Sequence, residues 1–414
     1  MPEFPVPSFQ ITIPISGNVY PLGVVFQIHI IVVAAFMGIA ILAPFAEYLG
    51  FRYADERWSE LAHQLGTTMG KVFAFGATWA VFALMLLFGL YPRLMGVLGG
   101  IFFWPWIAIT FTWFVMTLTA YGYAETWERL RYRHRLHMAI GWTFVLAAFA
   151  FITLVVELDS FMLTPTQEAP LSSATFNPSW LTEVIHRQVG NLSYAGFLVA
   201  AYGGAQVLYF RRTSEADRKF YDWVGHVGLV VGLGVVLLQP IVGWFYARQV
   251  MTGSPGAFRI MMVGENSWGF LVQTGLLGVL LLLSNLYMGL TLRRDNPSTS
   301  TINWMVGSTW VVGLLTLLGV VPQQVPLGLM TPWKYISLVG MDFITIINLV
   351  LYLRVSPNFR WGKVGRGSQL ALISIGIVIA ALMITMGIIR ASARGSYTIY
   401  GRMGPDQSQQ IQPP

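Results

Sequence analysis

The chain has 414 residues, of which 55% are hydrophobic and only 10% are charged. Soluble domains carry roughly 25% charged residues, so this composition excludes an ordinary water-soluble protein. No cysteine is present, which excludes disulfides, thiolate-held zinc, iron–sulfur clusters and covalently attached haem c within this chain. The formal charge of +7 is spread over short clusters between apolar runs, so we expect contact with membrane lipid and no nucleic-acid partner.

Apolar segments long enough to cross a bilayer recur along the whole chain. A helix needs about 20 apolar residues to cross the roughly 30 Å hydrocarbon layer. The sequence therefore predicts an all-α fold, a polytopic transmembrane helix bundle over 21–392, with an N-terminal outer segment at 1–20 and a C-terminal outer tail at 393–414. About ten spans are predicted, at 22–49, 69–92, 101–121, 137–158, 183–210, 221–248, 262–290, 303–322, 334–353 and 369–390.

The distribution of basic residues predicts the orientation of these spans. Seventeen of the 25 Lys and Arg fall in alternate connections on one side of the predicted bundle, and eight fall on the other. Cytoplasmic loops are the ones enriched in Lys and Arg. We therefore expect a multi-pass protein of a bacterial or archaeal cytoplasmic membrane, with both termini on the outer, periplasmic side.

Histidines inside a predicted span are candidate ligands, because ionisable groups in a membrane usually face a cavity, a cofactor or a partner. His29 lies in VVFQIHIIVVAAF with no charged neighbour, and His186 begins the fifth span on the outer side. His29 fits either a hydrogen-bonded neutral histidine or a ligand to a metal or haem. His63, His134 and His226 lie near basic inner loops, where roles at the lipid headgroups are expected.

Two further groups of residues are predicted on the same outer side as His186. The segment AFRIMM, residues 257–262, supplies Met261 and Arg259. His and Met together hold iron in some electron-transfer haems, and an arginine can neutralise a propionate. Carboxylates gather there as well, and they suit the release of protons from a quinol; these are Glu157, Asp159, Glu183 and Glu265.

These segments resemble subunit I of the cytochrome bd-type quinol oxidases in order and spacing. In the family's first helix a histidine precedes a glycine by nine residues, as His29 precedes Gly38. TEVIHRQVGNLSYAGF resembles the start of the fifth helix, whose histidine ligates the low-spin haem b, here His186. AFRIM resembles the segment that supplies the methionine of that haem and a nearby arginine, here Met261 and Arg259.

Other segments resemble the family in helix pattern. HQLGTTMGKVFAFGATWAVF resembles the second helix, and RLHMAIGW places His137 at the start of the fourth. The matching stretches cover roughly the first 290 residues. The resemblance implies haem b, one or more per chain, with His186, Met261 and His29 on iron and His137 in the cofactor-binding set. Glu183, Glu265 and Arg259 are the candidate catalytic residues for quinol and its protons.

Three departures from the family bear on the reaction. The family's third helix has a glutamate after a proline, whereas WPWIAITFTWFVMT, residues 104–117, contains no acid. The family also has a glutamate haem ligand near its C-terminus, followed by GRQPW, but no Glu follows Glu265 here. In addition, only about a dozen residues separate Arg248 from Met261, where the family has a long quinol-binding loop.

The leading hypothesis is a haem b electron-transfer subunit of a respiratory chain that oxidises quinol near the periplasmic face and passes electrons to haem or to a partner. We predict that this subunit does not reduce oxygen, because the family's glutamate ligands are missing. The expected partners are a second membrane subunit and c-type cytochrome subunits. The alternatives are a haem-free quinone-binding membrane anchor, a true oxygen-reducing bd-type oxidase, and a transporter, which is disfavoured because paired broken helices are not evident.

Overall fold

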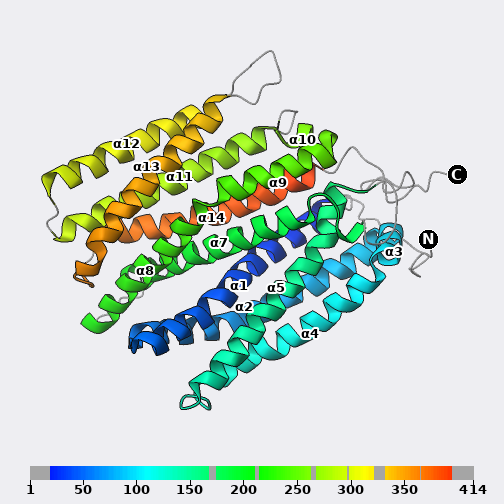
Figure 1. The fold of residues 1–414 in the computed structure, drawn as a ribbon, viewed down its shortest axis with the longest axis horizontal. Helices are drawn as coiled ribbons and strands as arrows, with labels where there is room; N and C mark the ends of the chain where they lie inside the picture. The colour runs from blue at the N-terminus through cyan, green and yellow to red at the C-terminus, as the bar shows by residue number, and fades with distance from the viewer. Residues whose placement is uncertain are drawn as a thin grey trace. The chain divides into compact units, whose positions relative to one another are not determined.

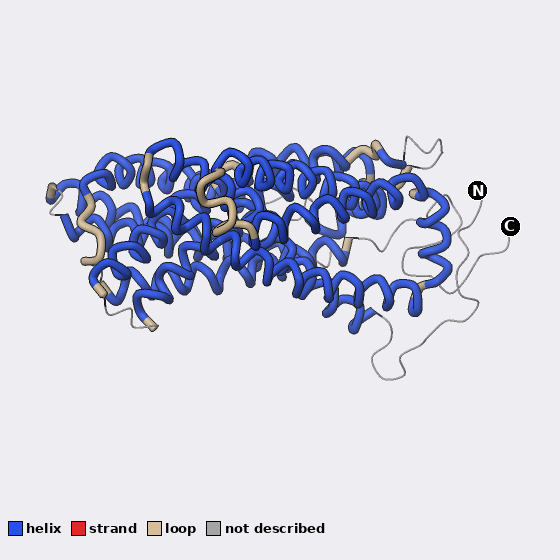
Figure 2. Tube along the Cα trace, turned by 90° about the horizontal axis from the view of Figure 1, so that it is seen from below, coloured by secondary structure: helices blue, strands red, loops and turns tan. Residues whose placement is uncertain are grey.

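The computed structural model describes residues 19–166, 174–209, 214–262, 267–295, 298–320, 332–363 and 365–393. Within these ranges the chain is helix and connecting loop, with no strand (Figure 2). This agrees with the predicted all-α class. Nine helical segments of the described residues are long and apolar enough to cross a membrane. The chain divides into two compact units: 1–188 with 241–259 and 390–414, and 189–240 with 260–389.

In the first unit, four long helices form a closed ring of neighbours. They are α1 (Val19–Tyr53), α2 (Glu56–Leu90), α4 (Phe103–Glu125) and α5 (His134–Leu163). Helix α1 packs against α2 and α5, and α4 packs against the same two helices (Figure 1). Short α3 (Pro92–Ile101) begins with a proline at its first turn, a position where the missing N–H costs nothing. Its apolar face covers Phe161 near the end of α5.

The sharp turn between α1 and α2 is built from local chemistry. Ala54 adopts a positive φ of 52°, and Asp55 caps α2 by accepting a hydrogen bond of 3.0 Å from the Arg57 backbone N–H. The Arg57 guanidinium also pairs with the Asp55 carboxylate at 2.7 Å. This side-chain hydrogen bond is the main cause that lowers the pKa of Asp55. The turn therefore allows the two long helices to run antiparallel.

The second unit is assembled from helices that the sequence pattern also predicted. It contains α8 (Glu215–Val236), α11 (Ser267–Leu292), α12 (Thr299–Val320), α13 (Pro332–Val355), most of α7 (Trp180–Leu208) and most of α14 (Arg366–Ser392). Helices α11, α12 and α13 pack against one another. Between them lies a buried polar network in which Asn348 donates to Asn285 Oδ1 at 2.7 Å and accepts from Trp304 Nε1 at 2.9 Å.

Close approach of α7 and α8 depends on glycines. A Cβ added at Gly232 would lie 2.8 Å from the Phe197 ring and from the Phe197 backbone N. The Ser193 hydroxyl donates to the Gly232 carbonyl at 2.9 Å. Gly228 and Gly232 are four residues apart, the small-xxx-small spacing that lets transmembrane helices approach closely.

Helix α2 begins at Glu56, before the predicted start of its span at 69, and α3 has no counterpart among the predicted spans. Two further differences concern α7 and α8. The predicted span 183–210 corresponds to α7, which is not among the nine apolar segments; polar residues such as Glu183, His186 and Asn191 lower its hydropathy. The predicted span 221–248 is divided into α8 and α9 (Gln239–Gly253), and α10 (Pro255–Met262) follows at once. The residues between Arg248 and Met261 are thus mostly helical. Of the predicted outer segment 1–20 and outer tail 393–414, residues 1–18 and 394–414 lie outside the described residues.

Candidate functional site

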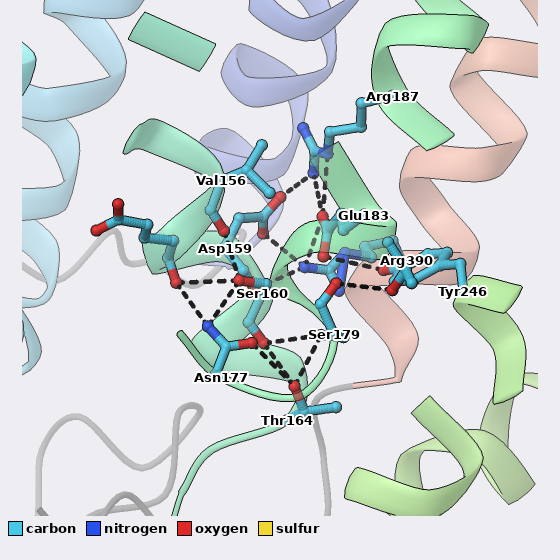
Figure 3. Close-up of polar contacts among 12 residues, drawn as sticks. Val156, Asp159, Ser160, Thr164, Asn177, Ser179, Glu183, Arg187, Tyr246 and Arg390 are labelled. Atoms are coloured by element: carbon cyan, nitrogen blue, oxygen red, sulfur yellow. Dashed lines mark hydrogen bonds and ion pairs between the residues drawn. The ribbon is translucent and has the colours of Figure 1, made fainter. Parts of the chain in front are cut away.

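Polar side chains gather where α5 ends and α7 begins, in the first unit (Figure 3). Asn177 lies just before α7, and its amide donates to Ser160 Oγ at 2.8 Å and to the Glu157 carbonyl at 3.3 Å. Thr164 Oγ1 lies 2.7 Å from Ser179 Oγ. All of these groups are buried. They fix the connection between the two helices, so the first turn of α7 is held in a defined position.

The first turns of α7 carry an ion cluster that joins four helices. Arg187 donates to Glu183 at 3.0 Å and also pairs with Asp159 of α5. Arg390, at the end of α14, lies 3.1 Å from both Asp159 Oδ1 and Glu183 Oε1 and donates to the Asp159 carbonyl at 2.6 Å. Tyr246 of α9 donates its hydroxyl to Glu183 Oε2 at 3.1 Å. Figure 3 shows these side chains pointing toward one another.

The cluster balances its own charge. Two guanidinium groups face two carboxylates, so the formal charges cancel. The Glu183 side chain is 2% exposed, and the Arg390 side chain is 13% exposed. A buried charge is tolerated only when it is paired and hydrogen-bonded, and each carboxylate here contacts both arginines. The ion cluster is therefore electrically neutral, and its charged groups are held in place by their mutual contacts.

His186 lies on α7 between Glu183 and Arg187, beside the ion cluster. Its ring is half-buried and lies against the Tyr246 ring, with centroids 5.4 Å apart. Gly243 of α9 also borders the ring, since a Cβ there would lie 3.7 Å from His186 Cε1. Tyr246 thus contacts both the ion cluster and the imidazole. The sequence predicts His186 and Glu183 as site residues but gives no signal that singles out Tyr246 or Arg390.

His29 is positioned in a way that suits a metal ligand. Its Nδ1 lies 3.2 Å from the Gly76 carbonyl of α2. Because a carbonyl only accepts, Nδ1 carries the proton and Nε2 carries the lone pair. Histidines that bind metals commonly have their other nitrogen held in this way by a backbone carbonyl. The residue therefore meets the chemical requirement for an iron ligand.

His137 is held differently. Its Nδ1 lies 2.8 Å from Glu47 Oε1, and its Nε2 lies 2.9 Å from the Tyr123 carbonyl. Both ring nitrogens are therefore engaged by the protein. The predicted place of His137 in the cofactor-binding set stays a prediction, and the geometry shows that its ring nitrogens already have partners.

The remaining predicted site residues are less closely tied to the ion cluster. Arg259 is exposed on α10, and Met261 is half-buried on the same helix but belongs to the second compact unit. Glu157 is buried in α5, and its carboxylate Oε2 has no hydrogen-bond partner among the described residues. Glu265 lies outside the described residues. The pairing of His186 with Met261 stays a prediction.

The helices and the site define a multi-span membrane protein with histidines and a neutral ion cluster inside its helical core. The chain belongs to the family of cytochrome bd terminal oxidase subunit I, whose model matches residues 21–411. That match runs well beyond the roughly 290 residues in which the sequence resemblance was recognised. The C-terminal third is thus part of the same family domain.

A solved structure supports the same fold. The bd oxidase from Geobacillus thermodenitrificans matches with a TM-score of 0.56 and 13% sequence identity, over 91% of this chain and 97% of that chain. At this identity the likeness concerns the fold. No curated protein matches the chain.

Proposed function

We propose that this protein is a haem b electron-transfer subunit that oxidises quinol near the periplasmic face of the cytoplasmic membrane. The His29 imidazole carries the proposal, because its Nδ1 contact with the Gly76 carbonyl leaves Nε2 free to bind iron. Membership of the bd oxidase subunit I family supports the same function. When bound, haem b supplies a one-electron carrier that the protein side chains cannot provide.

We assign His186 and Met261 to a low-spin haem and His29 to a second haem site. Tyr246 and the ion cluster orient the His186 backbone and ring, since Glu183 and Arg187 flank it on α7. The cluster holds its four charges in place and carries no net charge, so it adds little electrostatic bias to the oxidised or the reduced state. We leave His137 outside the proposed iron ligands because both of its ring nitrogens are engaged.

Quinol oxidation releases two electrons and two protons, so the site needs groups that accept protons and hold a polar headgroup. We propose that Glu183, Arg259 and Glu265 serve this step. Arg259 is exposed on α10, where the polar headgroup of a quinol can reach it. The two electrons then pass to haem or to a partner, for which we propose a second membrane subunit and c-type cytochrome subunits.

Direct oxygen reduction by this subunit is not part of the proposal. The family's third-helix and C-terminal glutamates have no counterpart in this sequence, which contains no Glu after Glu265. Oxygen reduction needs a haem with an open coordination position and a supply of protons. We therefore expect quinol-dependent reduction of an added c-type cytochrome without oxygen consumption by the isolated subunit.

The test is haem extraction from the purified full-length protein, read as a pyridine haemochrome spectrum, together with oxygen-electrode traces during quinol addition. We expect a haem b spectrum and no oxygen consumption. Absence of haem would overturn the proposal in favour of a haem-free quinone-binding anchor. Rapid oxygen consumption would instead identify a true oxidase.

A further inference from the structure

A second buried polar site lies at the far end of α5 from the ion cluster, within the first unit. His137 is near the start of α5 and Asp159 near its end, 22 residues apart, or roughly 33 Å along the helix. That distance matches the hydrocarbon thickness of a bilayer. The two polar sites of this unit therefore lie near opposite membrane faces.

The geometry of this site specifies one shared proton. The Tyr123 carbonyl can only accept, so His137 Nε2 always carries a proton. The contact of 2.8 Å between His137 Nδ1 and Glu47 Oε1 then needs one more proton between them. Without it, a ring lone pair would face a carboxylate. With it, the pair is neutral overall, either as an imidazolium with a carboxylate or as an imidazole with a carboxylic acid.

Burial of the pair makes loss of the shared proton energetically costly. The Glu47 and His137 side chains are 6% and 3% exposed. Loss of the shared proton would leave an uncompensated negative charge in a dry site, which is costly. The shared proton therefore keeps the buried pair neutral.

A route to the pair begins at two further buried oxygens. Glu47 Oε2 and the Tyr123 hydroxyl are buried, and the hydroxyl lies close enough to the Glu47 carboxyl to interact with it. Gly141 leaves room for the Tyr123 ring, because a Cβ there would lie 2.8 Å from Tyr123 Cε2. These two oxygens can pass a proton to Oε1 by rotation of the carboxyl group.

The surroundings of the pair contain other titratable groups, contributed by α2 and α5. His63 of α2 stacks on Trp127 at a centroid distance of 5.0 Å, and Trp127 meets the His137 ring edge-on at 5.1 Å. His134, at the exposed start of α5, lies against Phe51 of α1. His134 lies three residues before His137, so the pair lies about one turn from the exposed start of α5.

We propose that Glu47 and His137 form a proton-holding site that exchanges one proton with the aqueous phase at the membrane face opposite the ion cluster. The Tyr123 hydroxyl gives its proton to Glu47 Oε2 and regains one from the aqueous phase, and the transferred proton rests between Oε1 and Nδ1. Its departure leaves His137 neutral and Glu47 negative. A link between this exchange and electron transfer rests on the proposed function, whereas the exchange itself does not.

Infrared difference spectroscopy of the full-length protein, between low and high pH and in H2O and D2O, tests the exchange without any requirement for haem. The variant is Glu47→Gln, whose amide N–H can still donate to His137 Nδ1 but cannot exchange the shared proton. The matched control is Glu60→Gln, because Glu60 is exposed at the same end of this unit. We expect a deuterium-sensitive carboxyl or imidazolium band in the wild type and in Glu60→Gln, and its loss in Glu47→Gln.

An identical difference spectrum in Glu47→Gln overturns the proposal. If that variant does not fold, Tyr123→Phe decides, since it keeps the pair and removes the buried hydroxyl. Slower deuterium exchange of the same band then supports the route, and an unchanged exchange rate contradicts it.

A second measurement addresses the link to electron transfer. If haem is bound, we expect the midpoint potential to depend less on pH in Glu47→Gln than in Glu60→Gln. An equal pH dependence removes the link but leaves the infrared result standing. If no haem is bound, the proposed function fails, and the infrared spectra still decide whether the pair exchanges its proton.

Discussion

Arg390 and Asp159 are 231 residues apart in the sequence, yet the Arg390 guanidinium donates to the Asp159 carbonyl at 2.6 Å and pairs with its carboxylate at 3.1 Å. This contact ties the end of α14 to the end of α5. It also completes the neutral ion cluster, because Arg390 lies 3.1 Å from Glu183 as well.

Arg390→Ala should destabilise the protein. Removing one partner of a buried ion pair costs about 3–5 kcal/mol, and the partial exposure of Asp159 and Arg187, 23% and 28%, reduces this to on the order of 2 kcal/mol. Unfolding in detergent, followed by circular dichroism, measures the change. Arg131→Ala in the exposed loop between α4 and α5 is the control and should have little effect. Equal stability of the two variants would show that the contacts of Arg390 in the ion cluster do not stabilise the fold.

Gly232→Ala should weaken the contact between α7 and α8. The added methyl group would lie 2.8 Å from the Phe197 ring and backbone N, and overpacking of this kind costs about 1–3 kcal/mol. Gly234→Ala is a matched control on the same helix, because nothing lies within 4 Å of its Cβ position. Thermal unfolding of both variants gives the comparison. A Gly232 variant as stable as the Gly234 variant would contradict the close packing.

Asn348→Ala should loosen the packing of α11, α12 and α13. Asn348 donates to Asn285 and Ser308 and accepts from Trp304. Interhelical hydrogen bonds in membranes average about 0.6 kcal/mol each, so the loss of these contacts should cost on the order of 2 kcal/mol. Exposed Asn358, at the end of the short 3-10 helix that follows α13, provides the control substitution, Asn358→Ala. Tryptophan fluorescence should also change, because the Trp304 indole loses its partner.

The helices were largely predictable because each span carries its own signal, a long apolar run. The break between α8 and α9 near Leu237 was not, since the two helices form one continuous apolar segment, Glu215–Gly253. Helix α7 has the opposite property, because its polar first turns indicate a functional segment and also lower the hydropathy of the helix. Local composition therefore predicts where helices lie better than where they end.

The site was predictable only in part. Ionisable groups in apolar surroundings are energetically costly and therefore indicate a functional role. This signal singles out His29, Glu183 and His186. Arg390 and Tyr246 carry no such signal, because an arginine or a tyrosine near a helix end is ordinary. Their roles arise from tertiary contacts between distant segments. The same holds for Glu47, whose partner His137 is 90 residues away.

His29→Ala should remove the haem that we assign to this residue while the His186-dependent haem remains. The variant loses the one imidazole of α1, so no other histidine of that helix can take its place as an iron ligand. Haem content per protein and the reduced-minus-oxidised spectrum measure the loss. His134→Ala is the control, since His134 is exposed at the start of α5. Unchanged haem content in the His29 variant would leave the Gly76 hydrogen bond as its role.

The most direct test of the central claim is the reduced-minus-oxidised absorption spectrum of His186→Ala beside that of Met261→Ala. We expect both variants to lose the low-spin haem b signal while the protein still inserts into the membrane. Met262→Ala, one residue further along α10, should retain the signal. A low-spin spectrum that is unchanged in the His186 variant would contradict the proposed ligation.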